Sequence, residues 1–281
     1  MLEMMIGARK AEKHPWEMFF YGMLYATLAI IVVNWVFSSD AVLSRYSGIL
    51  VITFTVILAM PFMNYINRYE EKKDMQYEGM FLLLKEHKKA LLALLWMFLG
   101  FVVAFSMWYI LFSNQSFNAQ IETYCSINKP AAFQNCVSEF GKTKTTGFLT
   151  AKERLFSIFS NNIYVMIFTL IFSLVFGAGA IFVLAWNASV IAAAIGIFTK
   201  QEISQLPLGL ARYMIHGIPE IGAYFIAALA GGIISVAVVK KDIKSEKIWN
   251  VLQDSLNLII LAVIILFVAA LIEVFITPVL F

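Results

Sequence analysis

Three ionisable residues at four-residue spacing, Arg212, His216 and Glu220, lie at the mouth of an apolar stretch long enough to cross a bilayer. On a single helix this spacing would place their side chains on one face. Ionisable groups inside a membrane are costly, and they commonly mark proton or ion pathways. Together with Asn187, a polar residue near the start of the preceding apolar stretch, they form a candidate functional polar cluster.

The same residues also have a structural interpretation. Pro219 suits the first position of a helix, and Glu220 in the first turn would complement the helix dipole. Gly217 would then permit a helix turn that breaks the alignment with Arg212. His216 would hydrogen-bond a carbonyl group or Glu220 at the mouth of the span. The sequence leaves the functional and the structural interpretation open.

Other chemistry is not indicated. The three histidines are far apart and no H-E-x-x-H pattern occurs, so we expect no metal site. Serine and aspartate residues near the apolar stretches are too scattered for a catalytic triad. The glycine motifs that bind phosphates or dinucleotides do not occur, so we expect no cofactor and no enzymatic activity. Glu273, near the far end of the last apolar stretch, would either extend toward water or pair with Arg212.

The composition is that of a membrane protein. Of the 281 residues, 61% are hydrophobic and only 14% are charged, whereas soluble domains carry roughly 25% charged residues. The apolar runs are continuous and do not alternate, which favours helices over a β-barrel. The predicted fold class is therefore all-α, a polytopic bundle of transmembrane helices in a lipid bilayer. The net charge of +3 comes from basic residues between apolar runs, a pattern that indicates membrane topology and no nucleic-acid binding.

Seven apolar stretches are each close to the ~20 residues that cross a bilayer. They cover residues 16–37, 48–66, 90–112, 162–177, 181–199, 219–239 and 256–277. The fifth stretch either crosses the membrane fully or re-enters it. In the sixth, Ala223, Ala227, Gly231 and Ser235 recur every four residues. This spacing predicts a stripe of small side chains, here called the small-residue seam, against which another helix packs closely.

Orientation follows from the lysines and arginines, which collect in cytoplasmic loops. With seven spans, residues 1–15, 67–89 and 240–255 share one side and hold 13 of the 21 basic residues. We therefore expect a multi-pass protein of the cell membrane with its N-terminus in the cytoplasm. Its C-terminus and the hydrophilic loop 113–161 would then be extracytoplasmic.

Loop 113–161 contains both cysteines of the chain, Cys125 and Cys136. Two cysteines so close together predict a disulfide bond if the loop faces an oxidising compartment. Thr150 and Glu153 have the spacing of a capping box, so a helix should begin near Thr150 and lead into the fourth span.

Five groups of residues, with this order of helices and loops, carry a family resemblance. The groups are Asn161–Asn162, Gly177–Ala178–Gly179, Asn187, the run His216-Gly217-Ile218-Pro219-Glu220, and Ala230–Gly231–Gly232. They resemble the stage II sporulation protein M family of integral membrane proteins, over a five-helix membrane domain at residues 85–281. Residues 1–84 fall outside the resemblance, as a two-helix transmembrane hairpin with a charged cytoplasmic connection. This hairpin and the cysteine pair point to a divergent homologue, such as an archaeal one.

The resemblance implies a non-enzymatic scaffold that organises or remodels membrane or envelope complexes. We expect a homodimer that contacts protein partners through loop 113–161 and segment 67–89, although segment 67–89 would serve equally as a solvated helical linker. The second hypothesis is a transporter or channel for an ion or small solute, with the candidate polar cluster lining a cavity. A third, an intramembrane hydrolase, has no supporting motif. A packed seam would favour the scaffold, and a water-filled cavity that reaches Asn187 would favour transport.

Overall fold

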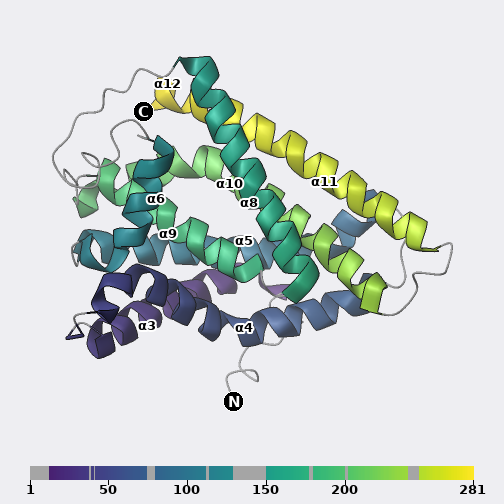
Figure 1. Ribbon diagram of the computed structural model, residues 1–281, viewed down its shortest axis with the longest axis horizontal. Helices are drawn as coiled ribbons and strands as arrows, with labels where there is room; N and C mark the ends of the chain where they lie inside the picture. The colour runs from purple at the N-terminus through teal and green to yellow at the C-terminus, as the bar shows by residue number, and fades with distance from the viewer. Residues whose placement is uncertain are drawn as a thin grey trace.

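The chain is described here from a computed structural model over residues 13–37, 39–40, 42–74, 80–111, 114–128, 150–176, 180–199, 202–239 and 247–281. Within these ranges the protein is helical and has no strand. Seven of the described helical segments are long and apolar enough to cross a membrane (Figure 1). The prediction of an all-α, seven-span membrane protein is therefore confirmed.

The helices follow one another in a simple order along the chain. The seven long ones are α3 (Glu17–Phe37), α4 (Ser47–Asp74), α5 (Met80–Leu111), α8 (Ala151–Phe176), α9 (Ala180–Phe198), α10 (Leu206–Val239) and α11 (Lys247–Leu271). The shorter ones are η1 (Leu43–Tyr46), η2 (Asn114–Phe117), α6 (Asn118–Asn128), η4 (Ile203–Gln205), the π-helical segment η6 (Ile272–Ile276) and α12 (Thr277–Leu280). The fifth predicted span, α9, is one unbroken helix of 19 residues, which at 1.5 Å per residue is about as long as the hydrocarbon layer is thick.

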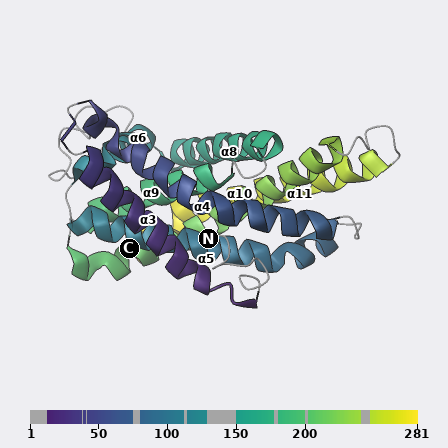
Figure 2. The ribbon, with the colours of Figure 1, turned by 90° about the horizontal axis from the view of Figure 1, so that it is seen from below.

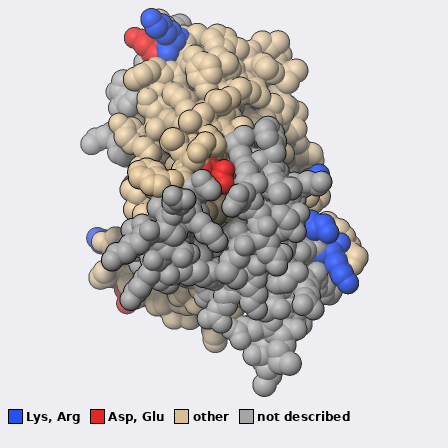
Figure 3. Space-filling model, turned by 90° about the vertical axis from the view of Figure 1, so that its right-hand side faces the viewer, with Lys and Arg blue, Asp and Glu red and all other residues tan. Residues whose placement is uncertain are grey.

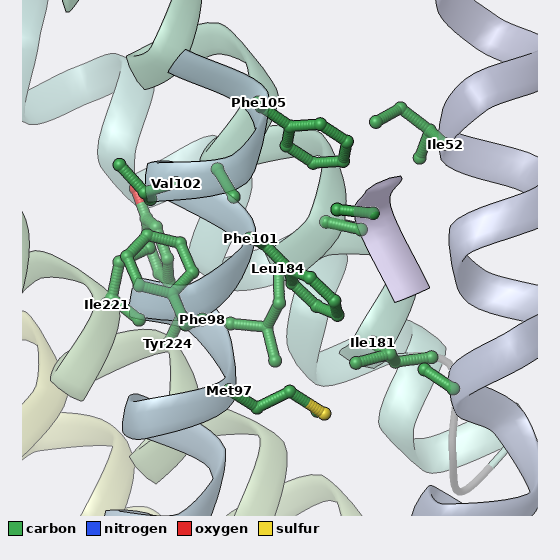
Figure 4. Close-up of a cluster of buried hydrophobic side chains, with 14 of the residues drawn as sticks. Ile52, Met97, Phe98, Phe101, Val102, Phe105, Ile181, Leu184, Ile221 and Tyr224 are labelled. Carbon is green, nitrogen blue, oxygen red and sulfur yellow. The ribbon is translucent and has the colours of Figure 1, made fainter. Parts of the chain in front are cut away.

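The main apolar core surrounds α5, which packs chiefly against α3 and α9. Its side chains Phe98, Phe101 and Phe105 are completely buried. Figure 4 shows Phe101 near Leu184 of α9, Phe98 near Tyr224 of α10, and Phe105 directed toward Ile52 of α4. The core thus joins helices from both halves of the chain. On the end of the molecule seen in Figure 3, most of the surface of the described residues is uncharged, and charged side chains occur at a few places.

The N-terminal hairpin belongs to this same bundle. A Cβ atom added to Gly22 of α3 would collide with the backbone carbonyl of Met97 on α5, and one added to Gly100 of α5 would collide with the carbonyl of Phe19. The two backbones therefore approach as closely as glycine allows, on both sides of the contact. Helix α4 packs against α3 and α9. Residues 17–62 are thus integrated with the helices that follow them (Figure 2).

The small-residue seam of α10 is in contact with α8. Ala223 and Ala227 are fully buried, and a Cβ atom on Gly231 would lie 2.6 Å from the carbonyl oxygen of Leu170 on α8. In the same contact the Ser173 hydroxyl donates a hydrogen bond of 2.6 Å to a carbonyl oxygen on α10, that of Ala228. The close approach of α10 to α8 is thus at Gly231, while Ser235 at the end of the seam is only partly buried.

Two predicted details of loop 113–161 have different outcomes. The capping box is confirmed, because the Thr150 N–H donates to Glu153 Oε2 (2.8 Å) and the Glu153 N–H donates to Thr150 Oγ1 (3.3 Å). Helix α8 then runs from Ala151 through the fourth span without interruption. Cys125 is fully buried on α6, but Cys136 lies outside the described residues, so their pairing stays a prediction.

Gly231 provides a test of the seam. We expect Gly231→Ala to lower the free energy of unfolding by about 1–3 kcal/mol, because the added methyl group has no room against the α8 backbone. Gly222→Ala on the same helix is the matched control, since a Cβ atom there would have nothing within 4 Å. Denaturant titration of the protein in bicelles measures both variants. Equal effects of the two substitutions would contradict the packing described here.

Candidate functional site

Helix α10 is continuous from Leu206 to Val239 and includes Pro219 in its interior. The predicted helix start at Pro219 and the predicted turn at Gly217 are therefore wrong. Proline removes one backbone hydrogen bond and commonly kinks a helix. Here α10 packs against α8, α9 and α11, and this packing maintains the helix. In consequence Arg212, His216 and Glu220 do lie on one face, as their spacing alone would place them.

The last span has an irregularity that faces this part of α10. After α11 ends at Leu271, residues 272–276 form one π-helical turn, and α12 follows. The Thr277 hydroxyl donates to the carbonyl oxygen of Ile272 at 3.2 Å, and Pro278 supplies no backbone N–H to the preceding turn. Single π-turns inside helices are rare and are frequent at functional sites. Glu273 lies within this turn.

His216 connects the two irregular segments. Its Nε2 atom lies 3.9 Å from Glu273 Oε2, and its Nδ1 atom lies 3.4 Å from Thr277 Oγ1. The residue is 8% exposed, so its imidazole is enclosed by the bundle. Two separate groups of the last span thus contact the two nitrogen atoms of one histidine on α10.

Glu220 lies one turn further along α10. Its Oε1 atom accepts a hydrogen bond of 2.8 Å from the Tyr224 hydroxyl, and its carboxyl group is also hydrogen-bonded to the side chain of Asn162 on α8. Asn162 is 5% exposed. Glu273 is close enough for its charge to act on Glu220. Side chains from α8, α10, η6 and α12 therefore meet inside the bundle, in what we call the membrane polar site: Asn162, His216, Glu220, Tyr224, Glu273 and Thr277.

Two arginines act electrostatically on His216: Arg212, one turn before it on α10, and Arg154, near the start of α8. Arg212 donates a hydrogen bond of 3.3 Å to the carbonyl oxygen of Phe281 and stacks over the Phe198 ring at 4.7 Å. Arg154 on α8 acts electrostatically on both His216 and Glu273. The predicted pairing of Arg212 with Glu273 is wrong, because the nearest basic group to that carboxylate is His216.

Two tyrosines lie close to Arg212. The hydroxyl groups of Tyr124 on α6 and Tyr213 on α10 are hydrogen-bonded to each other. Burial raises the pKa of Tyr124 above its ordinary value, and the hydrogen bond from Tyr213 and the charge of Arg212 only partly oppose this effect. Tyr124 is therefore a neutral hydrogen-bonding group at physiological pH. It links α6 to the polar face of α10.

The structure separates Asn187 from the rest of the predicted cluster. Its side-chain amide donates to the Val183 carbonyl oxygen, one turn earlier on α9, at 2.7 Å. This hydrogen bond satisfies the amide within its own helix. Three members of the site, Asn162, Tyr224 and Thr277, are not among the candidate site residues predicted from the sequence. Of these, Tyr224 was detectable, because it continues the four-residue spacing of Arg212, His216 and Glu220.

The arrangement of the side chains does not favour a metal ion. Among the described residues, no group of three or more His, Cys, Asp or Glu side chains is placed to hold a metal ion. Tyr224 and Asn162 donate hydrogen bonds to the Glu220 carboxyl group. Groups that direct their hydrogens at this carboxyl do not direct oxygen atoms at a cation there.

Comparison with known proteins identifies the family. The family model described as Stage II sporulation protein M matches residues 90–278, which is more than half of the chain. The chain belongs to the stage II sporulation protein M family. The predicted resemblance is thereby confirmed, and the matched residues include every member of the membrane polar site. Helix α3 and the membrane-spanning part of α4 precede the region that matches the family.

A relative of this stage II sporulation protein M family member occurs in an archaeon. The uncharacterised protein MJ0793 of Methanocaldococcus jannaschii is 34% identical over 127 residues, which cover 43% of this chain and 70% of the relative. No solved structure matches the chain.

Removal of the Tyr224 hydroxyl group tests the contribution of its hydrogen bond to Glu220. Tyr224→Phe removes a buried donor to the Glu220 carboxyl, and we expect a loss of about 1–3 kcal/mol in the free energy of unfolding. Tyr164→Phe is the control, because Tyr164 is 73% exposed on α8. Both variants are measured by denaturant titration in bicelles. If the two phenylalanine variants were equally stable, the Tyr224 hydrogen bond would not contribute to the bundle.

Proposed function

We propose that this stage II sporulation protein M family member is a non-enzymatic membrane scaffold that organises or remodels membrane or envelope complexes. The observation that supports this role is the close contact between helix backbones at Gly22, Gly100 and Gly231. Such contacts hold the helices in one relative position, which a frame for partner proteins requires. A packed seam, such as the contact of α10 with α8 at Gly231, favours a scaffold over a transporter.

The scaffold has a defined assembly and a defined orientation in the cell membrane. The scaffold is a homodimer with a cytoplasmic N-terminus, and the excess of basic residues in segments 1–15, 67–89 and 240–255 supports this orientation. Partners bind at the extracytoplasmic loop 113–161 and at segment 67–89. Of this loop, α6 packs against α9, so α6 would hold the remainder of the loop at a defined place on the bundle.

Transport of an ion or small solute is the second candidate. It is supported by the membrane polar site, in which ionisable side chains from α10 and η6 meet within membrane-spanning segments. Asn187 does not contribute to this site, so a pathway would follow α10 and the α11–α12 segment instead of α9.

Reconstitution separates the two candidates. The wild-type protein and a His216→Ala/Glu220→Ala variant are placed in liposomes, and we measure ion and solute flux together with the dimer fraction after chemical crosslinking. A scaffold gives no flux above that of empty liposomes for either protein, while the variant has a reduced dimer fraction because its polar site is incomplete. Flux by the wild type that the variant lacks, at an unchanged dimer fraction, would support transport and contradict the scaffold.

The proposed extracytoplasmic loop carries a disulfide between Cys125 and Cys136. Protein purified from membranes under non-reducing conditions, unfolded and treated with a maleimide, should show no added mass. After reduction it should show two additions per chain, because both thiols are then free. Two additions before reduction would contradict the disulfide and weaken the proposed orientation. The control is Cys125→Ser, which leaves one thiol per chain to react with the maleimide.

A further inference from the structure

The hydrogen bonds around His216 indicate where its proton lies. The Thr277 hydroxyl hydrogen is donated to the Ile272 carbonyl at 3.2 Å, so Thr277 Oγ1 is an acceptor toward His216 Nδ1 at 3.4 Å. The neutral imidazole therefore carries its hydrogen on Nδ1, and Nε2 has a free lone pair. That lone pair faces Glu273 Oε2 at 3.9 Å. Two acceptors face one another here unless a further proton is bound.

The carboxyl group of Glu220 also lacks a cationic partner among the described residues. Its hydrogen-bond partners, Tyr224 and Asn162, are neutral. Within the described part of the chain it makes no ion pair, and the ionisable group that acts most strongly on it is another carboxyl, that of Glu273. Two neighbouring carboxylates in a membrane-spanning region cannot both remain ionised without compensation.

Other charged or titratable side chains also act on these three residues. They come from α6, α8 and α10: Tyr124, Arg154, Arg212, Tyr213 and Tyr224. The two arginines are permanently charged, and tyrosine hydroxyls are neutral over the physiological range. Neither kind of group takes up a proton near neutral pH. Glu220, His216 and Glu273 are therefore the members of the group that can exchange one.

We propose that His216, Glu220 and Glu273 form a proton-binding site inside the bundle, which holds one proton in addition to the one on His216 Nδ1. The proton is supplied by water. It binds on Glu273 Oε2 and is directed at the lone pair of His216 Nε2, and its uptake raises the net charge of the site by one. No other bond forms or breaks. The π-turn at residues 272–276 serves to direct the Glu273 carboxyl toward His216.

A proton fits the site better than a metal cation does. A cation would need several oxygen or nitrogen acceptors directed at one point. Among the described residues no such group of His, Cys, Asp or Glu is present, and Glu220 is surrounded by donors. This inference goes beyond the scaffold proposal and applies to the family member whether it organises complexes or transports a solute.

Infrared difference spectroscopy between alkaline and acidic pH tests the proposal on the full-length protein in lipid nanodiscs. We expect a carbonyl-stretching band from one protonated carboxyl group per chain. This band should titrate at a different pH from the exposed carboxyl groups. Glu273→Gln should abolish it, and Glu220→Gln should shift its titration midpoint. Glu122→Gln on α6 is the matched control, because Glu122 is exposed and its substitution should leave the signal unchanged.

Three results would overturn the site. The first is the lack of such a band in the wild type, and the second is its persistence in Glu273→Gln. The third is its displacement at constant pH when sodium replaces choline in the buffer, which would indicate a cation site. The wild-type protein labelled with carbon-13 glutamate gives a test that needs no variant. The band must then move to lower frequency, and an unmoved band would also contradict the assignment.

Discussion

The unbroken course of α10 is the constraint on which the rest of the structure depends. The helix continues through Gly217 and Pro219 although the proline removes a backbone hydrogen bond. Because it continues, residues 212, 216, 220 and 224 form one polar face, and the small-residue seam forms another part of the same helix. A break at Pro219 would have separated the two. The polar site and the packed seam are thus held in a fixed relation by a single element.

Close packing between backbones gives this element its position. Gly231 brings α10 against α8, and Gly22 and Gly100 bring α3 against α5. In a membrane, helices gain little from burying apolar side chains against each other, so close van der Waals contact and hydrogen bonds between helices carry more of the association. The bond from Ser173 to the Ala228 carbonyl is one such hydrogen bond. Asn162 lies on the same helix α8 and reaches Glu220 from it.

The two irregular segments of the bundle face the same histidine. Pro219 is in α10 near His216, and Pro278 follows the π-turn that carries Glu273. Pro278 lies in the first turn of α12, where proline is well tolerated, whereas Pro219 lies inside α10 and removes a backbone hydrogen bond there. In this stage II sporulation protein M family member, the helix irregularities lie at the site where ionisable groups meet. Such irregularities are common at functional positions of helical membrane proteins.

The sequence by itself determined the fold class, the number of spans, the capping box at Thr150 and the small-residue seam, because hydrophobicity and local spacing are properties of short stretches. It also placed Arg212, His216 and Glu220 at the correct spacing. Only the tertiary structure decided that α10 passes through Pro219, since the packing of neighbouring helices outweighs the local preference of proline. It likewise decided that Asn162, Glu273 and Thr277 join the site and that Asn187 does not. These partners lie tens of residues away along the chain, and contacts between distant helices depend on how the helices pack, which no local pattern of residues specifies.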